Sequence, residues 1–126
     1  MYKRQGFYAP LKEKLCEKAE EYFSGGVILD AGCGEGYYTE SVAERISDGE
    51  IIGIDISKTA ADYSAKRCKK VRFAAASVFH LPIADKSCDM LITLFAPYSG
   101  EEFQRVLKKE GIMIKRWSCF KKECSH

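Results

Sequence analysis

The chain has 126 residues, of which 46% are hydrophobic and 30% are charged, and its net charge is +2. This length is that of one domain, and the nearly neutral charge neither requires nor excludes a nucleic acid partner. No apolar run approaches the roughly 18–20 residues that a membrane helix needs, and no apolar segment follows the basic N-terminus as in a secretory signal. We therefore expect a cytoplasmic protein that has no membrane partner.

Apolar runs and amphipathic segments alternate along the chain. Apolar residues at helical spacing predict a first helix that has Pro10 in its first turn. Ser57 is a typical N-cap residue, and Ser99 and Glu102 have capping-box spacing, which predicts the starts of two later helices. The predicted helices cover residues 10–23, the segment directly after the glycines at 32–36, residues 57–69 and residues 99–108. The predicted strands cover residues 27–30, 51–54, 71–74, 89–95 and 112–115.

Strands that alternate with helices are typical of right-handed βαβ units and a parallel sheet. The sequence therefore predicts an α/β, Rossmann-like fold with a parallel sheet of about five strands and helices on both faces. We expect one domain over residues 1–116 and a basic, cysteine-containing tail over residues 117–126 that is disordered or atypical. The last strand would then be an open apolar edge, through which two copies of the chain would form a homodimer.

Three glycines, Gly32, Gly34 and Gly36, directly follow the first predicted strand. Glycine tolerates positive φ and lets a ligand touch the backbone, and open α/β sheets bind nucleotides at such a turn. The spacing differs from the G-x-G-x-x-G pattern of dinucleotide sites. Asp30 stands two places before the first glycine, where its charge would repel a pyrophosphate and attract a cation. Both features favour S-adenosylmethionine, which carries a sulfonium and an ammonium group and no phosphate, over NAD.

Asp55 ends the second predicted strand, beyond the glycines and the helix that follows them. A carboxylate at this position can accept hydrogen bonds from both ribose hydroxyls of an adenosyl group. The alternative is that Asp55 only turns the chain before Ser57. The glycine-rich loop at the appropriate distance favours the ribose role.

The six cysteines provide no pattern that is typical of a metal site. No two of them have C-x-x-C spacing, and the first four are expected to be free, largely buried thiols. Cys119, Cys124 and His126 lie together in the tail, but three ligands so close to a chain end make a poor zinc site. We therefore predict that the chain holds no metal.

Residues 30–39 resemble motif I of the class I S-adenosylmethionine-dependent methyltransferases. Within that superfamily, the similarity narrows to the large-subunit ribosomal RNA guanine-N1 methyltransferases and extends from about residue 4 to residue 114. The segments that point to this subfamily are Gly-Phe-Tyr-x-Pro-Leu and Ala-Pro. The segments that carry the narrower resemblance are residues 6–11, 55–58, 76–77, 81–82 and 95–97.

The resemblance implies a cofactor site. The turn from Gly32 to Gly36 would hold the methionine part of S-adenosylmethionine, Asp55 would hold the ribose, and Ile56 would pack on the adenine. Ser77 stands where many methyltransferases have an acid near the adenine amino group, so this contact would be weaker or made by the backbone. The implied cofactor-binding residues are Tyr8, Asp30, Gly32, Gly34, Gly36, Tyr37, Asp55, Ile56, Ser77 and Leu81.

The resemblance also implies a place for the methyl acceptor. Phe95, Ala96 and Pro97 would face the methyl group and the incoming base, while no catalytic base stands out. His80 and Asp85 lie in a nearby loop, where such residues are more often part of the surface.

Two departures from the family matter for the function. Its N-terminal zinc module and its C-terminal region have no counterpart here, so we expect a truncated form. The resemblance implies S-adenosylmethionine-dependent methylation of guanine N1 in large-subunit ribosomal RNA, with RNA as partner. The alternatives are a truncated cofactor-binding remnant without catalysis and a small-molecule methyltransferase, whereas the glycine spacing makes an NAD-dependent dehydrogenase the least favoured.

Overall fold

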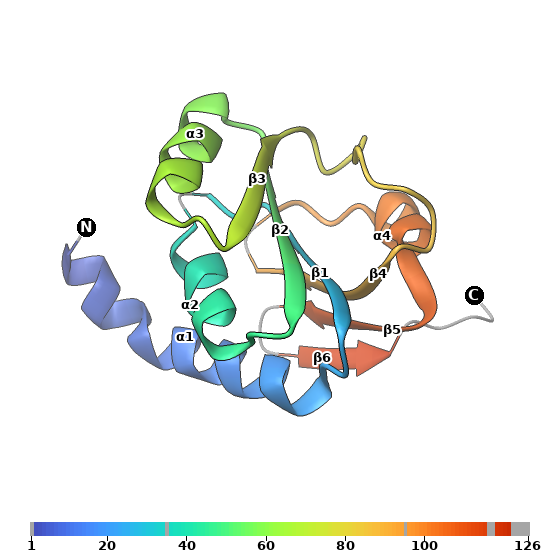
Figure 1. Cartoon of the computed structure of the whole chain (residues 1–126), viewed down its shortest axis with the longest axis horizontal. Coiled ribbons are helices and arrows are strands. Elements are labelled where there is room, and N and C mark those ends of the chain that lie inside the picture. Colours follow the sequence, from blue (N-terminus) through green and yellow to red (C-terminus); the bar gives the residue numbers. More distant parts are fainter. Residues whose placement is uncertain (1, 35, 95, 116–117, 122–126) are drawn as a thin grey trace.

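The computed structural model describes residues 2–34, 36–94, 96–115 and 118–121, with side chains described between residues 10 and 115. The described chain forms α1 (Tyr2–Tyr22), β1 (Gly26–Ala31), α2 (Tyr37–Arg45), β2 (Gly49–Asp55), α3 (Lys58–Arg67), β3 (Val71–Ala75), β4 (Cys88–Thr93), α4 (Gly100–Val106), β5 (Leu107–Lys115) and β6 (Ser118–Lys121) (Figure 1).

All six strands belong to one sheet, in the order β3-β2-β1-β4-β5-β6. Strands β1 to β5 run parallel to one another, and β6 is antiparallel to β5. The chain moves outward from β1 to β3 and then returns to the other side of β1 with β4. The C-terminal ends of β1 and β4 therefore meet where the strand order reverses, which is where open α/β sheets bind their ligands.

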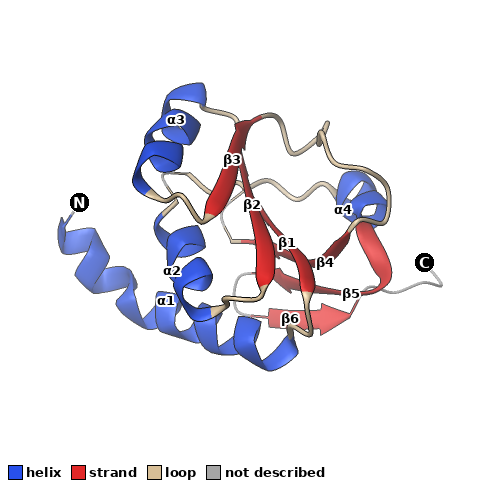
Figure 2. Ribbon diagram, viewed as in Figure 1, coloured by secondary structure: helices blue, strands red, loops and turns tan. Residues whose placement is uncertain are grey.

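Helices cover both faces of the sheet, as the sequence predicts (Figure 2). Side chains alternate between the two faces along each buried strand, so neighbouring residues enter different cores. Ile28 and Met90 pack on the side of α1 and α2, whereas Leu29 and Leu91 pack on the side of α4 with Phe103. The predicted α/β, Rossmann-like fold with five parallel strands is confirmed.

Strand β5 does not form the edge of the sheet. The prediction of an open apolar edge at this strand was wrong, because β6 pairs with β5 over Ile112–Lys115. Residues 118–121 of the segment that was expected to be a tail thus supply the missing backbone hydrogen bonds. The argument for a homodimer through this edge loses its premise, since a covered edge no longer offers unpaired backbone groups.

Two local predictions also differ from the structure. Helix α1 starts at Tyr2, so Pro10 lies inside the helix and not in its first turn. The helix predicted over residues 99–108 ends at Val106, and β5 starts already at Leu107, with a shift in register between the Cys88–Leu107 pair and the Met90–Ile112 pair. Three exposed residues after Leu107 are accommodated there.

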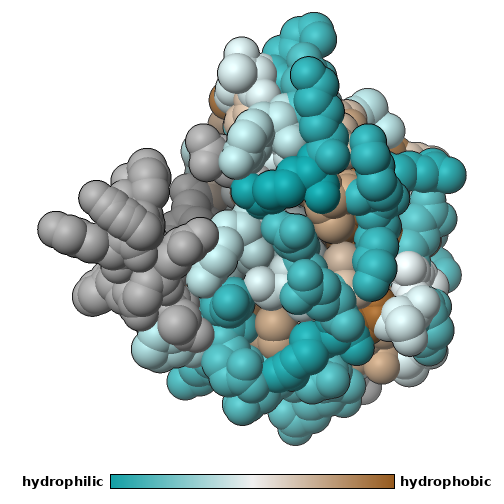
Figure 3. Space-filling view, turned by 60° about the vertical axis from the view of Figure 1, so that its left-hand side comes forward, coloured by the Kyte–Doolittle hydropathy of each residue, from teal (hydrophilic) through white to brown (hydrophobic). Residues whose placement is uncertain are grey.

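The coloured part of the face in Figure 3, which lies on the left in Figure 1, is mostly hydrophilic, with only small apolar areas between the hydrophilic side chains. Within the described residues, no helix combines the length and the apolar character that crossing a membrane requires.

The N-cap of α3 provides a first test of the fold. Ser57 Oγ accepts a hydrogen bond from the backbone N–H of Ala60 at 3.1 Å, so Ser57→Ala is expected to lower the free energy of unfolding by about 1 kcal/mol. Urea denaturation measures this change. Ser99→Ala is the matched control, because Ser99 occupies the N-cap of α4 without a side-chain cap hydrogen bond. Equal losses in the two variants would contradict the assignment.

Candidate functional site

A pocket of about 410 Å³ opens at the C-terminal ends of four parallel strands. Its volume lies in the range of small-molecule sites, which is roughly 300–1,000 Å³. The loops after β1, β2, β3 and β4 each contribute part of its wall. The residues that line it are Gly32, Cys33, Gly34, Asp55, Ile56, Ala76, Ser77, Val78, Phe79, Ala96 and Pro97.

The turn after β1 needs glycine for two different reasons. Gly32 has φ +79°, and a Cβ built on it would lie 2.3 Å from Cβ of Ala96. The N–H groups of Gly32 and Cys33 both donate to the carbonyl oxygen of Ile54, at 2.7 and 2.8 Å. Gly34 has φ +59°, and a Cβ there would meet no atom within 4 Å. Gly32 therefore allows the turn to pack closely, whereas Gly34 leaves open space beside the backbone in the pocket wall.

Gly36 has a structural role that the sequence did not reveal. It lies at the N-cap of α2 with φ +83°, and it does not line the pocket. A Cβ at this position would lie 3.0 Å from Oγ of Ser64 and 3.2 Å from the ring of Phe73. Only its lack of a side chain lets α2 begin this close to α3 and β3, and nothing in the glycine spacing indicates that contact.

Asp55 lies in the pocket wall and holds the turn at the same time. Its Oδ1 accepts from the N–H of Gly34 at 3.0 Å, and its Oδ2 accepts from the N–H of Ser57 at 3.0 Å. The alternative role, in which Asp55 turns the chain before Ser57, is thus present in the structure. Each carboxylate oxygen has further lone-pair capacity, so these two bonds leave acceptor sites that a ribose could use.

Asp30 lies beneath the glycine turn and is only 4% exposed, so it does not line the pocket. Its Oδ2 accepts a hydrogen bond from Oγ1 of Thr39 in α2 at 2.5 Å. Burial raises the pKa of Asp30 to about 6, and the nearby charge of Asp55 adds to this effect, while the bond from Thr39 opposes it. Asp30 therefore connects the end of β1 to α2 and would influence a ligand only through the turn.

Cys33 is the one thiol among the described lining residues. Burial raises the pKa of this thiol well above its usual range, and the charges of Asp30 and Asp55 raise it further. The side chain therefore stays protonated at neutral pH and contributes to the pocket as a small apolar group.

The apolar part of the pocket comes from residues after β2 and β3. Ile56 is 78% exposed and Phe79 is 49% exposed, which is unusual for large apolar side chains. Ser77 Oγ accepts from the N–H of Phe79 at 3.1 Å, so the Ser77 hydroxyl shapes this loop. Sequence reasoning missed Phe79, although its place two residues after Ser77 in the same loop was a usable signal.

Besides Asp30 and Gly36, two more of the described residues that were predicted for the site, Tyr37 and Leu81, do not line the pocket. The ring of Tyr37 lies under Nζ of Lys12, at 4.9 Å from the ring centroid, and Leu81 is buried in the core on the side of α4. The side chain of Tyr8 and the whole of Phe95 lie outside the described residues. Ala96 and Pro97, which were predicted beside Phe95, do line the pocket.

Among the described side chains, no group of three His, Cys, Asp or Glu residues is arranged to hold a metal ion. The cluster of Cys119, Cys124 and His126 that was considered from the sequence falls outside the described side chains.

Residues 28–111 match a family model described as a methyltransferase domain, and this match covers most of the sheet and all the described pocket residues. The chain belongs to the class I S-adenosylmethionine-dependent methyltransferases. The glycine turn and Asp55 thus occupy a methyltransferase scaffold, as the resemblance of motif I predicts.

Two relatives narrow the similarity within the methyltransferases. One relative is YxjB of Bacillus subtilis, which is named as a proposed 23S rRNA (guanine-N(1)-)-methyltransferase. It is 34% identical to this chain, over 87% of this chain and 41% of its own length. The 23S rRNA (guanine(748)-N(1))-methyltransferase of Streptomyces fradiae is 32% identical over 86% of this chain and 40% of its own length. The chain therefore spans about two fifths of the length of these relatives.

A solved methyltransferase structure has the same fold. Geranyl diphosphate C-methyltransferase of Streptomyces coelicolor, in complex with Mg²⁺, geranyl diphosphate and S-adenosyl-L-homocysteine, superposes with a TM-score of 0.71. The alignment covers 85% of this chain and 46% of that chain, at 19% identity. At this identity the likeness establishes the fold and carries no information on the substrate.

Proposed function

We propose that this methyltransferase domain binds S-adenosylmethionine in the pocket at the C-terminal ends of β1 to β4. We further propose that it supplies the methyl donor for N1 of a guanine in 23S ribosomal RNA. The observation that carries the cofactor site is the convergence of the Gly32–Gly34 turn and the carboxylate of Asp55, joined by a 3.0 Å hydrogen bond, on one pocket. The relatives support the choice of RNA as acceptor.

Each part of the cofactor has a chemically matched wall. The open space beside the backbone of Gly34 leaves room for the methionine part, and Asp55 would accept hydrogen bonds from the ribose hydroxyls. The adenine would lie between the exposed apolar side chains of Ile56 and Phe79, where both faces of the base would be shielded from water. This arrangement removes two solvent-exposed apolar groups from water, which gives a physical reason for their exposure in the described structure.

The methyl acceptor would approach from the loop after β4. Ala96 and Pro97 form the wall of the pocket there, next to the glycine turn. When bound, S-adenosylmethionine supplies a methyl group that transfers as its carbon–sulfur bond breaks. The chain contributes by holding the donor and the acceptor in line. Asp55 is the one carboxylate among the described lining residues, and the ribose would occupy it, so no second described carboxylate of the pocket remains to take the N1 proton.

Calorimetry with S-adenosylhomocysteine tests the cofactor half of the proposal. The wild-type chain is expected to bind one molecule, and Asp55→Ala to weaken binding by at least about tenfold, because hydrogen bonds to a charged group are lost. Asp62→Ala is the control, since Asp62 makes an exposed ion pair with Lys58 on α3 and does not line the pocket. An absence of heat at millimolar ligand, or equal affinities of the two variants, would contradict the assignment of the pocket as the cofactor site.

The acceptor is tested by incubating the chain with S-adenosylmethionine and 23S ribosomal RNA. A methyl group on guanine N1 blocks Watson–Crick pairing, so reverse transcription should stop at the modified position. Methyl transfer to members of a small-molecule panel, with none to RNA, would support a small-molecule methyltransferase instead. Cofactor binding without transfer to any acceptor would favour a domain that binds the cofactor but needs further protein for catalysis.

A further inference from the structure

One wall of the pocket is part of a long irregular segment. Residues 76–87, between β3 and β4, form neither helix nor strand, and their first part, from Ala76 to Phe79, lines the pocket. A segment of this kind loses much conformational entropy when it is held in one shape, so specific contacts must fix it. The structure shows where these contacts are made.

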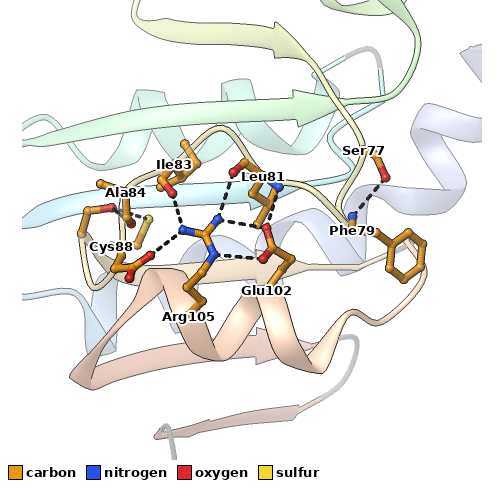
Figure 4. A network of polar contacts seen from close by, with 10 residues as sticks. Ser77, Phe79, Leu81, Ile83, Ala84, Cys88, Glu102 and Arg105 are labelled. Carbon is orange, nitrogen blue, oxygen red and sulfur yellow. Dashed lines mark hydrogen bonds and ion pairs between the residues drawn. The ribbon is translucent and has the colours of Figure 1, made fainter.

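Arg105 of α4 is the centre of those contacts (Figure 4). Its guanidinium donates to the carbonyl oxygens of Leu81 at 2.9 Å and Ile83 at 2.8 Å. It also binds both carboxylate oxygens of Glu102, at 2.9 Å each, and Oδ1 of Asp85 at 2.7 Å. Asp85 is largely exposed, so this last ion pair contributes little. The planar fork of arginine thus holds two backbone carbonyls of the segment at once.

Glu102 completes the attachment from the same helix. Its Oε1 accepts from the backbone N–H of Leu81 at 2.7 Å, so Arg105 and Glu102 together bind both the N–H and the carbonyl of that residue. The hydrogen bonds from Arg105 and from Leu81 hold the pKa of Glu102 at about 2, so its carboxylate is ionised at neutral pH. The helix start that the spacing of Ser99 and Glu102 predicts is confirmed, but Ser99 makes no side-chain cap hydrogen bond and the carboxylate of Glu102 is used by this long-range network.

The attachment lies directly beyond the pocket wall. At the near end, the N–H of Ala76 donates to the carbonyl oxygen of Asp55 at 2.9 Å. Within the wall, the N–H groups of Phe79 and His80 both donate to Ser77, at 3.1 and 3.0 Å. The wall is therefore fixed to β2 at one end and to α4 at the other, and Arg105 and Glu102 form the second of these attachments.

We propose that Arg105 and Glu102 are positioning residues for the cofactor, which set its affinity by holding the Ala76–Phe79 wall through the backbone of Leu81 and Ile83. This inference rests on the proposed function of the pocket. Neither side chain lines the pocket, so any effect on the ligand must be transmitted through the loop. The affected part of the ligand is the adenosyl end, because the wall lies beside Ile56 and Asp55.

Arg105→Lys tests the proposal, because lysine keeps the charge but lacks the planar fork that binds several acceptors at once. We expect S-adenosylhomocysteine and 5′-methylthioadenosine, which lacks the amino acid part, to bind about tenfold more weakly, both by the same factor. Hydrogen exchange of the Leu81, Phe79 and His80 amides should accelerate, while exchange in β1 stays unchanged. Glu102→Gln, which keeps the shape and removes the charge, should shift both measurements in the same direction by less.

Arg45→Lys is the matched control. Arg45 of α2 also makes two ion pairs, with Glu13 and Glu20 of α1, but these lie on the other face of the sheet. The Arg45→Lys variant should leave the affinity for S-adenosylhomocysteine and the hydrogen exchange of the Leu81, Phe79 and His80 amides unchanged. Affinity within about twofold of wild type in Arg105→Lys, or faster exchange throughout the core, would overturn the positioning role. If the wild-type chain binds no S-adenosylhomocysteine, the proposed function fails, and exchange of the Leu81 amide alone then decides whether Arg105 holds the loop.

Discussion

Replacing Gly32 by alanine is expected to abolish the binding of S-adenosylhomocysteine and to lower the free energy of unfolding by roughly 2–4 kcal/mol. The added Cβ would lie 2.3 Å from Cβ of Ala96, and the backbone would keep a φ of +79°, which alanine rarely adopts. The turn would have to move away from the loop after β4, and both loops are walls of the pocket. Urea denaturation and calorimetry measure the two effects.

Two other glycine variants separate the strain from the loss of the pocket. Gly34→Ala adds a methyl group where no atom lies within 4 Å, so it should cost only about 1–2 kcal/mol of backbone strain but should still weaken ligand binding. Gly25→Ala has a similar open environment and a φ of +111°, but Gly25 precedes β1 and lies outside the pocket. It should reduce stability without changing affinity. Wild-type affinity in Gly32→Ala would contradict the placement of the cofactor at this turn.

The ligand-free protein is expected to lose about 3 kcal/mol of stability through Asp30 as the pH rises from about 4 to about 6. Burial raises the pKa of Asp30 to about 6, so in this window the native state holds a proton that the unfolded state has released. When the native state binds more protons, stability falls with rising pH. The physical reason is that ionisation places a charge in a site that is only 4% exposed.

Asp30→Asn isolates this contribution from those of the other carboxylates. Asparagine can still accept the hydrogen bond from Thr39, but it does not ionise. The difference in unfolding free energy between wild type and variant, measured in urea at several pH values, should grow between pH 4 and pH 6 in favour of the variant. The charge of Asp55 faces the same carboxylate, so Asp55→Asn should reduce the effect. A constant difference across this window would show that Asp30 is not a buried acid with a raised pKa.

The layered sheet was predictable because its signals are local. Ile28 and Leu29 are adjacent apolar residues with 0% exposure, as expected of a parallel strand covered on both faces. The strand edge was not predictable in this way. Whether β5 is covered depends on whether residues 118–121 return beside it, which is a contact between segments and has no periodic signal in the sequence.

The site was predictable where it depends on strand ends. Asp55 ends a parallel strand and Gly32, Ser77 and Ala96 each follow one, and parallel strands bring their C-terminal ends to one edge. The prediction was less successful for neighbours of these residues, because proximity in sequence does not determine the direction of a side chain. Leu81 is close to Ser77 in the chain but enters the core on the side of α4.

The role of Arg105 shows a further limit. Its partners Leu81 and Ile83 lie in a different segment of the chain, and their binding groups are backbone carbonyls that any residue type would carry. The sequence pattern around Glu102 satisfies a local rule for a helix start, yet its carboxylate binds the backbone N–H of Leu81 and the guanidinium of Arg105. Local pattern rules do not include such long-range partners.

The location of the cofactor is tested most directly by nuclear magnetic resonance, with S-adenosylhomocysteine titrated into the isotope-labelled chain. Binding at the proposed pocket should shift the backbone amides of Gly32, Gly34, Ser57 and Phe79 and leave that of Gly111, at the opposite end of the strands, unchanged. Shifts that centre on the opposite end of the sheet, or a spectrum that does not respond to saturating ligand, would contradict the assignment of this pocket as the methyl-donor site.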